Sequence, residues 1–371
     1  MRVLINTVFL ASPRFGGSWT YTRNLLSSLE AYAGETEFIV LANARTAPLL
    51  RGLQMEVRVE LAHPGLRALR VGWEELVLPR IARRYAPNVF HSTGNTLPPV
   101  RVCPAVVTLH DFQYHFYPGN FPALRRAYLR RAVPAALGRA KRVICISDFT
   151  RRHAAELYGA DAGKLCVIHE AGLMPGELEG AAREETLRSR FRLERPFVLS
   201  AGSSLPHKNL RRLAEAFGLI LHDVPHDLVI AGGDVPDPAL REAVRRSGAE
   251  GRVRFTGFMD RPDLVGLYRS ADLFVFPSLF EGFGIPALEA MECGCPVAAS
   301  RAGSLPEVTG SAAEFFDPTD TRSMAETMRR ICTDRSLREE LKERGARRAA
   351  AFSWEKVGRE TMQLYRSIRD N

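Results

Sequence analysis

Short apolar runs alternate with segments of helical pattern through nearly all of the 371 residues, and this alternation most restricts the folds open to the chain. A parallel strand needs a crossover, usually a helix, before the next strand can lie beside it. Repeated strand–helix units therefore predict parallel sheets with helices on their faces. The strand-like runs are 2–7, 38–42, 89–92, 105–109, 142–147 and 164–169, and then 197–201, 228–232, 253–257, 273–277 and 297–300.

The alternation is interrupted once. Residues 171–195 run from Ala-Gly-Leu-Met-Pro-Gly-Glu into a charged helical segment without a strand-like stretch, so we place a linker there. A chain of this length is long for one core and sufficient for two. We therefore expect a Rossmann-like doubly wound domain over residues 1–172, a second over 173–351, and an amphipathic helix in 352–371 with Ser353 as its N-cap.

The stretch Glu281-Gly-Phe-Gly-Ile-Pro-Ala-Leu-Glu289 has the pattern of a glycine loop entering a helix, directly after an apolar run. Pro286 suits the first turn of a helix, because its φ is already helical. Backbone N–H groups at a helix N-terminus form an anion site suited to phosphate. The two glutamates would repel a pyrophosphate and match neutral hydroxyls better. The stretch therefore predicts a nucleotide-sugar site.

Glu281 and Glu289, with seven residues between them, resemble the paired-glutamate signature of retaining GT-B glycosyltransferases of family 4, also called group 1. The flanking matches are Ala271-Asp272, Pro277-Ser278, Ala290-Met291, Gly294, Pro296, Val297 and 303–307. The resemblance implies an α/β GT-B fold: two Rossmann-like doubly wound domains facing a central cleft, with a C-terminal helix crossing back to the first. It also implies an enzyme that transfers a hexose from a nucleotide-diphosphate sugar, with retention of anomeric configuration.

The same resemblance implies roles in the second domain. Lys208 is similar to the family lysine that holds the donor diphosphate, a role that suits a compact cation. Many relatives have arginine directly before this lysine, and some have another several residues earlier, whereas this chain has His207 and Gly202-Ser203. Neutralisation of the diphosphate charge would then depend more on Lys208. The implied donor site comprises Ser203, Lys208, the Phe258-Met259 backbone beside the base, Glu281 on the sugar hydroxyls, the amides of Phe283, Gly284 and Ile285 on the phosphate, and Glu289 on the ribose.

In the first domain, the loop Arg14-Phe15-Gly16-Gly17-Ser18 follows the first strand. The resemblance implies that Gly16 and Gly17 face the pyrophosphate, although a Gly-Gly pair alone fits an ordinary turn. His110 ends a strand-like run, where open α/β sheets bind ligands. His110-Asp111 also resembles the family pattern in which the histidine lies beside the donor sugar. The predicted catalytic residues are His110, Lys208 and Glu281.

Breaking a sugar–phosphate bond requires stabilisation of the charge that builds on the leaving diphosphate. Lys208, the loop amides and the helix N-termini could supply this. The chain has no Asp-x-Asp motif of the kind that metal-dependent transferases of the other major fold commonly use, and its six cysteines lack the spacing of a zinc site or a disulfide framework. We therefore predict transfer that needs no metal and no cofactor besides the nucleotide-sugar.

The net charge of +9 indicates anionic partners without choosing among them. The segments 73–84 and 121–142 carry many cations among apolar residues, a pattern typical of a solvated helix face or of a contact with an anionic membrane. No apolar run reaches transmembrane length and the N-terminus lacks a signal-peptide pattern, so we expect a cytoplasmic protein, with membrane association at the inner face as one alternative. Nucleic-acid binding is disfavoured, because no binding module accompanies the charge.

Three regions, 110–112, 128–142 and 206–209, look most similar to mannosyltransferase-like bacterial enzymes that build surface polysaccharides. This favours a GDP-mannose-like donor over UDP- and dTDP-sugars. The acceptor could be a saccharide, a lipid-linked glycan or a glycosylated natural product. The alternatives left open are a noncatalytic nucleotide-sugar or anionic-lipid binding protein, and a nucleotide-sugar epimerase or a phosphorylase on a similar scaffold.

Overall fold

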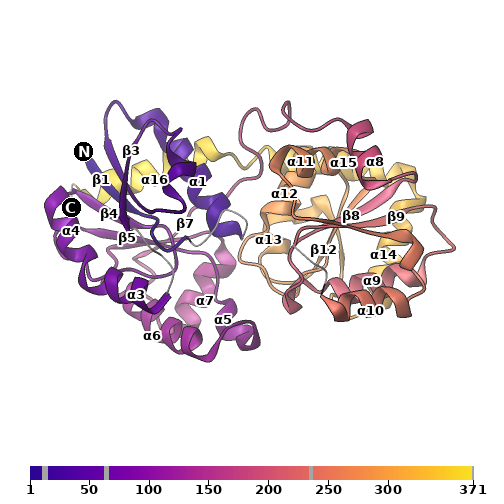
Figure 1. Cartoon of the computed structure of the whole chain (residues 1–371), viewed down its shortest axis with the longest axis horizontal. Helices are drawn as coiled ribbons and strands as arrows, with labels where there is room; N and C mark the ends of the chain where they lie inside the picture. The colour runs from indigo at the N-terminus through magenta and orange to yellow at the C-terminus, as the bar shows by residue number, and fades with distance from the viewer. Residues whose placement is uncertain (11–15, 62–66, 234–236, 370–371) are drawn as a thin grey trace. The chain divides into compact units, whose positions relative to one another are not determined.

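The computed structural model describes residues 1–10, 16–61, 67–233 and 237–369. The chain forms two compact units (Figure 1). The first unit combines Met1–Glu170 with the C-terminal segment Trp354–Asn371, and the second is Ala171–Ser353. The last helix thus belongs to the first unit although it follows the second in sequence, as the GT-B resemblance implied.

The first unit is built on a seven-stranded sheet in the order β3-β2-β1-β4-β5-β6-β7, and every neighbouring pair is parallel. Its strands are β1 (Arg2–Asn6), β2 (Glu37–Asn43), β3 (Glu56–Leu61), β4 (Val89–Ser92), β5 (Ala105–Leu109), β6 (Arg142–Cys145) and β7 (Leu165–Val167). Its helices are α1 (Gly17–Leu29), α2 (Ala47–Leu50), α3 (Arg67–Leu76), α4 (Leu78–Tyr85), α5 (Gln113–Phe116), α6 (Ala123–Arg139), α7 (Asp148–Tyr158) and α16 (Trp354–Arg369).

Helices cover both faces of this sheet. α1 and α16 pack together on one face, and the aliphatic residues of α4 and α6 bury the other (Figure 1). The two packed helices approach closely at Gly358, where an added Cβ would lie 2.8 Å from the Ser28 carbonyl oxygen. α16 is also joined to the sheet by a buried polar contact, because Tyr365 Oη lies 2.6 Å from His91 Nδ1 on β4. Burial lowers the pKa of His91 to about 3, with His110 acting in the same direction, so this imidazole is neutral.

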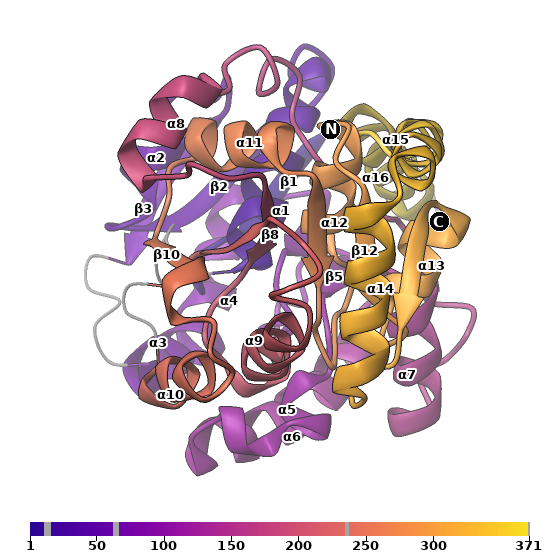
Figure 2. The same ribbon diagram turned by 90° about the vertical axis from the view of Figure 1, so that its right-hand side faces the viewer.

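The second unit contains a six-stranded parallel sheet in the order β10-β9-β8-β11-β12-β13. In Figures 1 and 2, α8, α11, α12 and α15 lie on one face and α9, α10 and α14 on the other. The strands are β8 (Phe197–Ala201), β9 (Asp227–Ala231), β10 (Val253–Gly257), β11 (Leu273–Phe276), β12 (Val297–Ser300) and β13 (Ala313–Phe316). The helices are α8 (Glu184–Phe191), α9 (Leu210–Leu219), α10 (Pro238–Arg246), α11 (Arg261–Ser270), α12 (Ile285–Glu292), α13 (Leu305–Thr309), α14 (Thr321–Thr333) and α15 (Arg335–Ala349).

Each sheet has a point where the strand order reverses, between β1 and β4 in the first unit and between β8 and β11 in the second. Open α/β sheets bind ligands outside the carboxyl ends of the strands at such a switch point, because the two following loops diverge there. Lys208 follows β8 and Glu281 follows β11. The topology therefore brings these distant segments to one edge of the second sheet.

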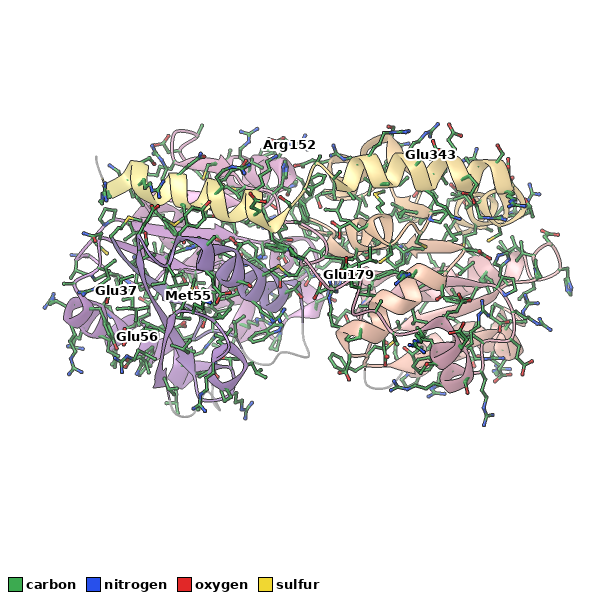
Figure 3. The ribbon with its side chains drawn as sticks, turned by 90° about the horizontal axis from the view of Figure 1, so that it is seen from above. Glu37, Met55, Glu56, Arg152, Glu179 and Glu343 are labelled. Carbon is green, nitrogen blue, oxygen red and sulfur yellow. The ribbon has the colours of Figure 1, made fainter. Side chains whose placement is uncertain are left out.

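The structure adds strands β3 and β13, which the apolar pattern does not predict. Both lie at sheet edges. β3 begins at Glu56, labelled in Figure 3, and its Val59 side chain is 50% exposed, so the strand lacks the continuous apolar run of a central parallel strand. α1 also begins at Gly17, within the segment that the sequence predicts to be a glycine loop. Among the described helices, none combines the length and apolarity needed to cross a bilayer.

Candidate functional site

Lys208 and Glu281 form a close ion pair at the switch point of the second sheet. Lys208 Nζ lies 2.6 Å from Glu281 Oε1, and the two side chains are 20% and 14% exposed. The same Nζ lies 5.7 Å from the centroid of the Phe276 ring, at the end of β11. Lys208, predicted to bind the diphosphate, and Glu281, predicted to bind the adjoining sugar, are thus neighbours.

His207 adds no positive charge to this edge. His207 is buried, with 3% of its surface exposed. Burial, and after it the charge of the adjacent Lys208, lowers the pKa of His207 to about 4. His207 is therefore neutral near pH 7 and cannot replace the arginine that relatives place before the lysine. Ser203 lies half-buried on the same loop, between β8 and Lys208.

The loop that carries Glu281 is held by the segment after β12. The single hydroxyl proton of Ser304 is shared between the Phe283 carbonyl oxygen, 2.7 Å from Oγ, and the Glu281 carbonyl oxygen, 3.1 Å from it. Gly303 has φ +61°, and a Cβ there would stand 2.6 Å from the Glu281 carbonyl oxygen. Only glycine fits both this backbone conformation and this close approach. The Gly303-Ser304 turn therefore fixes the backbone position of Glu281.

α12 begins directly after this loop. Gly284 is its N-cap residue, with φ 110° and ψ 43°, and no side chain of the described residues caps the helix there. The side chains of Phe283 and Ile285 are buried, at 2% and 6% exposure of the residue. Ligand contact by these two residues would therefore come from their amides, as the sequence predicts, and the helix dipole favours an anion at this end.

Glu289 lies on α12 and is 3% exposed. Its Oε1 is 2.6 Å from Arg261 Nη1, at the start of α11. Arg261 also donates from Nε and Nη2 to the two carboxylate oxygens of Glu177, at 3.0 and 2.9 Å. Glu289, which is predicted to bind the ribose, thus has a cationic partner in Arg261. Sequence reasoning missed Arg261 and Glu177; the one available signal was an arginine two residues after the predicted base contact at Met259.

Phe258 and Met259 follow β10, the strand at one edge of the sheet. Phe258 is 44% exposed and Met259 is half-buried. Between this loop and Lys208, Gly232 has φ +105° and an added Cβ would lie 2.8 Å from the Gly202 carbonyl oxygen. The carboxyl ends of β8 and β9 can approach this closely only because Gly232 lacks a side chain.

In the first unit, Gly16 is the N-cap of α1 with φ 91° and ψ 159°, and both Gly16 and Gly17 are exposed. No side chain of the described residues caps this helix. Arg14 and Phe15, which precede the pair in the predicted loop, lie outside the described residues. The geometry leaves the N–H groups of the first turn of α1 without a side-chain cap from the described part of the chain.

His110 follows β5 and is 7% exposed. Its Nε2 lies 2.8 Å from the Thr93 carbonyl oxygen, so this nitrogen carries a proton and donates it. Its Nδ1 lies 3.7 Å from Glu170 Oε1. Burial works against a charged imidazole, but Glu170 and the Thr93 carbonyl outweigh it, and the pKa of His110 is raised. Glu170, also missed by sequence reasoning, is a lone glutamate after the last strand of the unit.

The chain is similar in sequence to known proteins along most of its length. Residues 183–348 match the family model "Glycosyl transferases group 1", and residues 15–171 match "Glycosyltransferase Family 4". O-antigen chain mannosyltransferase B of Escherichia coli is 32% identical over 290 residues, which cover 77% of this chain and 76% of that protein. Serotype-specific mannosyltransferase WbdA of Escherichia coli is 36% identical over 179 residues, 47% of this chain but only 22% of that protein.

Among solved structures, Anabaena Alr3699/HepE in complex with UDP-glucose superimposes with a TM-score of 0.75 at 21% identity. The match covers 99% of this chain and 100% of that one. A match at this identity establishes the fold alone. Together with the mannosyltransferase matched over 76% of its length and the two family models, it shows that the chain belongs to the group 1, family 4 glycosyltransferases, with the two-unit α/β GT-B fold, and is an enzyme of glycosyl transfer.

Proposed function

We propose that this glycosyltransferase moves a hexose from a nucleotide-diphosphate sugar to a hydroxyl of a saccharide, a lipid-linked glycan or a glycosylated natural product, with retention of configuration. The observation that carries the proposal is the Lys208–Glu281 pair beside the N-terminus of α12. A GDP-mannose-like donor is favoured over UDP- and dTDP-sugars. Its support is that two relatives are named mannosyltransferases, one of them along most of its length.

The proposed chemistry is electrostatic. Lys208 and the amides at the start of α12 would stabilise the leaving diphosphate, Glu281 would accept hydrogen bonds from hydroxyls of the transferred sugar, and Glu289 from the ribose. Binding of the diphosphate would give Lys208 a second anionic partner, which its three N–H donors can serve together with Glu281. No step of this scheme calls for a metal ion.

Retention would follow from substitution on one face of the sugar. The bond between the anomeric carbon and the phosphate oxygen breaks, the acceptor oxygen bonds to the same face of that carbon, and the acceptor proton passes to the leaving phosphate. The charge that Lys208 and the amides stabilise is the charge of this same phosphate. We propose that His110 positions the donor sugar, beside which the family resemblance places it, because its Nε2 already donates to the Thr93 carbonyl oxygen and its Nδ1 faces Glu170.

Calorimetric titration with GDP, UDP, dTDP and ADP tests the proposal. We expect one nucleotide to bind clearly better than the others, and EDTA to leave its affinity unchanged. The same titration of Lys208→Ala should show weaker binding of the nucleoside diphosphate but an unchanged, low affinity for the nucleoside. Failure of all four nucleotides to bind would contradict the donor site and favour the lipid-binding alternative. Release of an epimerised sugar without acceptor would favour the epimerase.

We also propose that the first unit contacts an anionic membrane surface. Residues 67–142 contain thirteen Arg or Lys and three Asp or Glu, a net charge of +10, while the whole chain carries +9. This stretch also exposes large apolar side chains: Leu76 is 67%, Val77 37% and Leu124 79% exposed. Arginines beside exposed leucine and valine match a surface of anionic headgroups over acyl chains.

Two of the helices involved are adjacent, since Arg139 Nη1 of α6 lies 3.6 Å from Glu75 Oε2 of α3. A surface pocket of about 420 Å³ is lined by Leu76, Arg80, Arg83 and Arg101, among others. We expect sedimentation with vesicles of mixed phosphatidylcholine and phosphatidylglycerol, and none with phosphatidylcholine alone. R80E/R83E should weaken this binding about tenfold or more.

A matched control is R245E/R246E, on α10 of the second unit, where both arginine side chains are well exposed, at 62% and 75%. This variant changes the net charge by the same amount and should keep the vesicle affinity. Equal loss in both variants would show that net charge alone drives the binding. Equal binding of wild type to both vesicle types would contradict the anionic surface.

A further inference from the structure

Arg261 joins two carboxylates from different parts of the second unit. Its Nε and Nη2 donate to both oxygens of Glu177, at 3.0 and 2.9 Å, and its Nη1 lies 2.6 Å from Glu289 Oε1. A guanidinium presents its donors in a rigid planar fork. Because Glu177 engages two of these donors side by side, the direction of Nη1 is set from the Glu177 side.

Glu177 is itself fixed. Its Oε2 accepts a hydrogen bond from the Met174 amide at 2.9 Å, and its side chain is 17% exposed. The Arg261 side chain is 30% exposed and that of Glu289 only 4%. The chain of contacts therefore runs from an anchored backbone through Glu177 and Arg261 to a buried carboxylate on α12, the helix whose N-terminus is the proposed phosphate site.

We propose that Arg261, held by Glu177, is a positioning residue that directs the Glu289 carboxylate to accept hydrogen bonds from the ribose of the donor nucleotide. Arg261 occupies Oε1, and the second carboxylate oxygen is assigned to the ligand. The inference rests on the proposed function, in which Glu289 binds ribose. It adds a residue that neither the paired-glutamate signature nor the lysine motif contains.

The charges around Glu289 show why it needs this cation. Glu292 ends α12 and Cys293 follows it directly, Tyr268 belongs to α11, and Glu177 lies across Arg261. Burial raises the pKa of Glu292 to about 7, and the charge of Glu289 acts in the same direction. Without Arg261, the buried Glu289 carboxylate would lose the cation paired with it, and an uncompensated buried charge is costly.

The test is calorimetric titration of the full chain with whichever of GDP, UDP, dTDP and ADP the wild type binds most tightly. R261Q should raise the Kd about tenfold or more, since a hydrogen bond to a charged group is lost. R261K keeps the charge but loses the fork, so its Kd should rise less than that of R261Q.

E177Q is the matched control, because it cuts the other side of the same contact and leaves a cation beside Glu289. It should lower the thermal midpoint about as much as R261Q but raise the Kd less. In a double-mutant cycle, R261Q should add little to the Kd of E289A, because Arg261 acts through Glu289.

A wild-type Kd in R261Q, or losses that add fully in the double variant, would overturn the positioning role. Any of these results would leave the donor site itself intact, because the wild type still binds nucleotide. Absence of nucleotide binding by the wild type would instead reject the proposed donor site, and the role of Arg261 with it.

Discussion

Replacing Lys208 with alanine should reduce kcat about a hundredfold while the enzyme stays folded. The substitution removes the cation that lies 2.6 Å from Glu281 Oε1 and leaves that carboxylate, 14% exposed, without this partner. In the proposed reaction the same cation faces the departing diphosphate. The predicted loss therefore concerns a charge that is worth more in the transition state than in the ground state.

The magnitude follows from this geometry. Two unit charges about 3 Å apart interact by about 5–6 kcal/mol at an effective dielectric constant of about 20. If about half a unit of charge develops on the leaving oxygen, Lys208 contributes about 2–3 kcal/mol to the transition state alone, or about 10²-fold in kcat. The ion pair itself is mostly shielded but not sealed from water, so its loss should lower the free energy of unfolding by only about 1 kcal/mol.

The assay is release of the nucleoside diphosphate under single-turnover conditions, with the donor that the wild type consumes. Thermal unfolding should show a midpoint within about 2–4 °C of wild type, as expected for a unit of this size. Lys208→Arg keeps the charge with a different donor geometry and should fall between the two. Glu281→Gln in the Lys208→Ala background separates the loss of the cation from the effect of an unpaired carboxylate.

A Lys208→Ala enzyme with kcat within threefold of wild type, and an intact fold, would refute this account of leaving-group stabilisation. So would a double variant with Glu281→Gln that recovers wild-type kcat. In that case the lysine would serve only to neutralise its glutamate neighbour.

Three further predictions concern other parts of the molecule. Glu289→Ala should raise the nucleotide Kd and the donor KM about tenfold or more and leave kcat within a few-fold of the wild-type value, because the ribose contact is the same in the ground and transition states. A fall in kcat at constant KM in steady-state kinetics would contradict this prediction. Gly303→Ala should lower the free energy of unfolding by more than the control Gly294→Ala. Both substitutions carry a similar cost of about 1–2 kcal/mol for positive φ, since Gly294 has φ +71°, but only Gly303→Ala adds a clash at 2.6 Å with Glu281, whereas no described atom lies within 4 Å of a Cβ at Gly294. Equal losses in urea unfolding would refute the close approach. The pKa of His91 is about 3 in the folded protein, so below pH 6.5 the unfolded chain binds a proton that the native state does not, and the free energy of unfolding should fall by about 1.4 kcal/mol per pH unit between 6.5 and 3. His91→Phe should be less stable at pH 7 but should lose stability less steeply on acidification. Parallel slopes of stability against pH in urea unfolding would count against this prediction.

The family, the two-unit α/β fold and the enzyme class could all be predicted from the sequence, and all three are confirmed. The reason is that strand–helix alternation and glycine-loop motifs are local: each needs only a few consecutive residues to be recognised. β3 and β13 were missed for the same reason, because an edge strand such as the one around Val59 is half-exposed and lacks a local apolar signature. The roles of the site residues stay predictions.

Only the tertiary structure decided which of these residues meet. Lys208 contacts Glu281 because β8 lies beside β11 in the sheet, although β9 and β10 separate them in sequence. In the same way Arg261 reaches Glu289 because α11 packs beside α12. The chemical type of a side chain is written in the sequence, but its partners, its burial and therefore its charge state depend on strand order and packing, which no short stretch of residues contains.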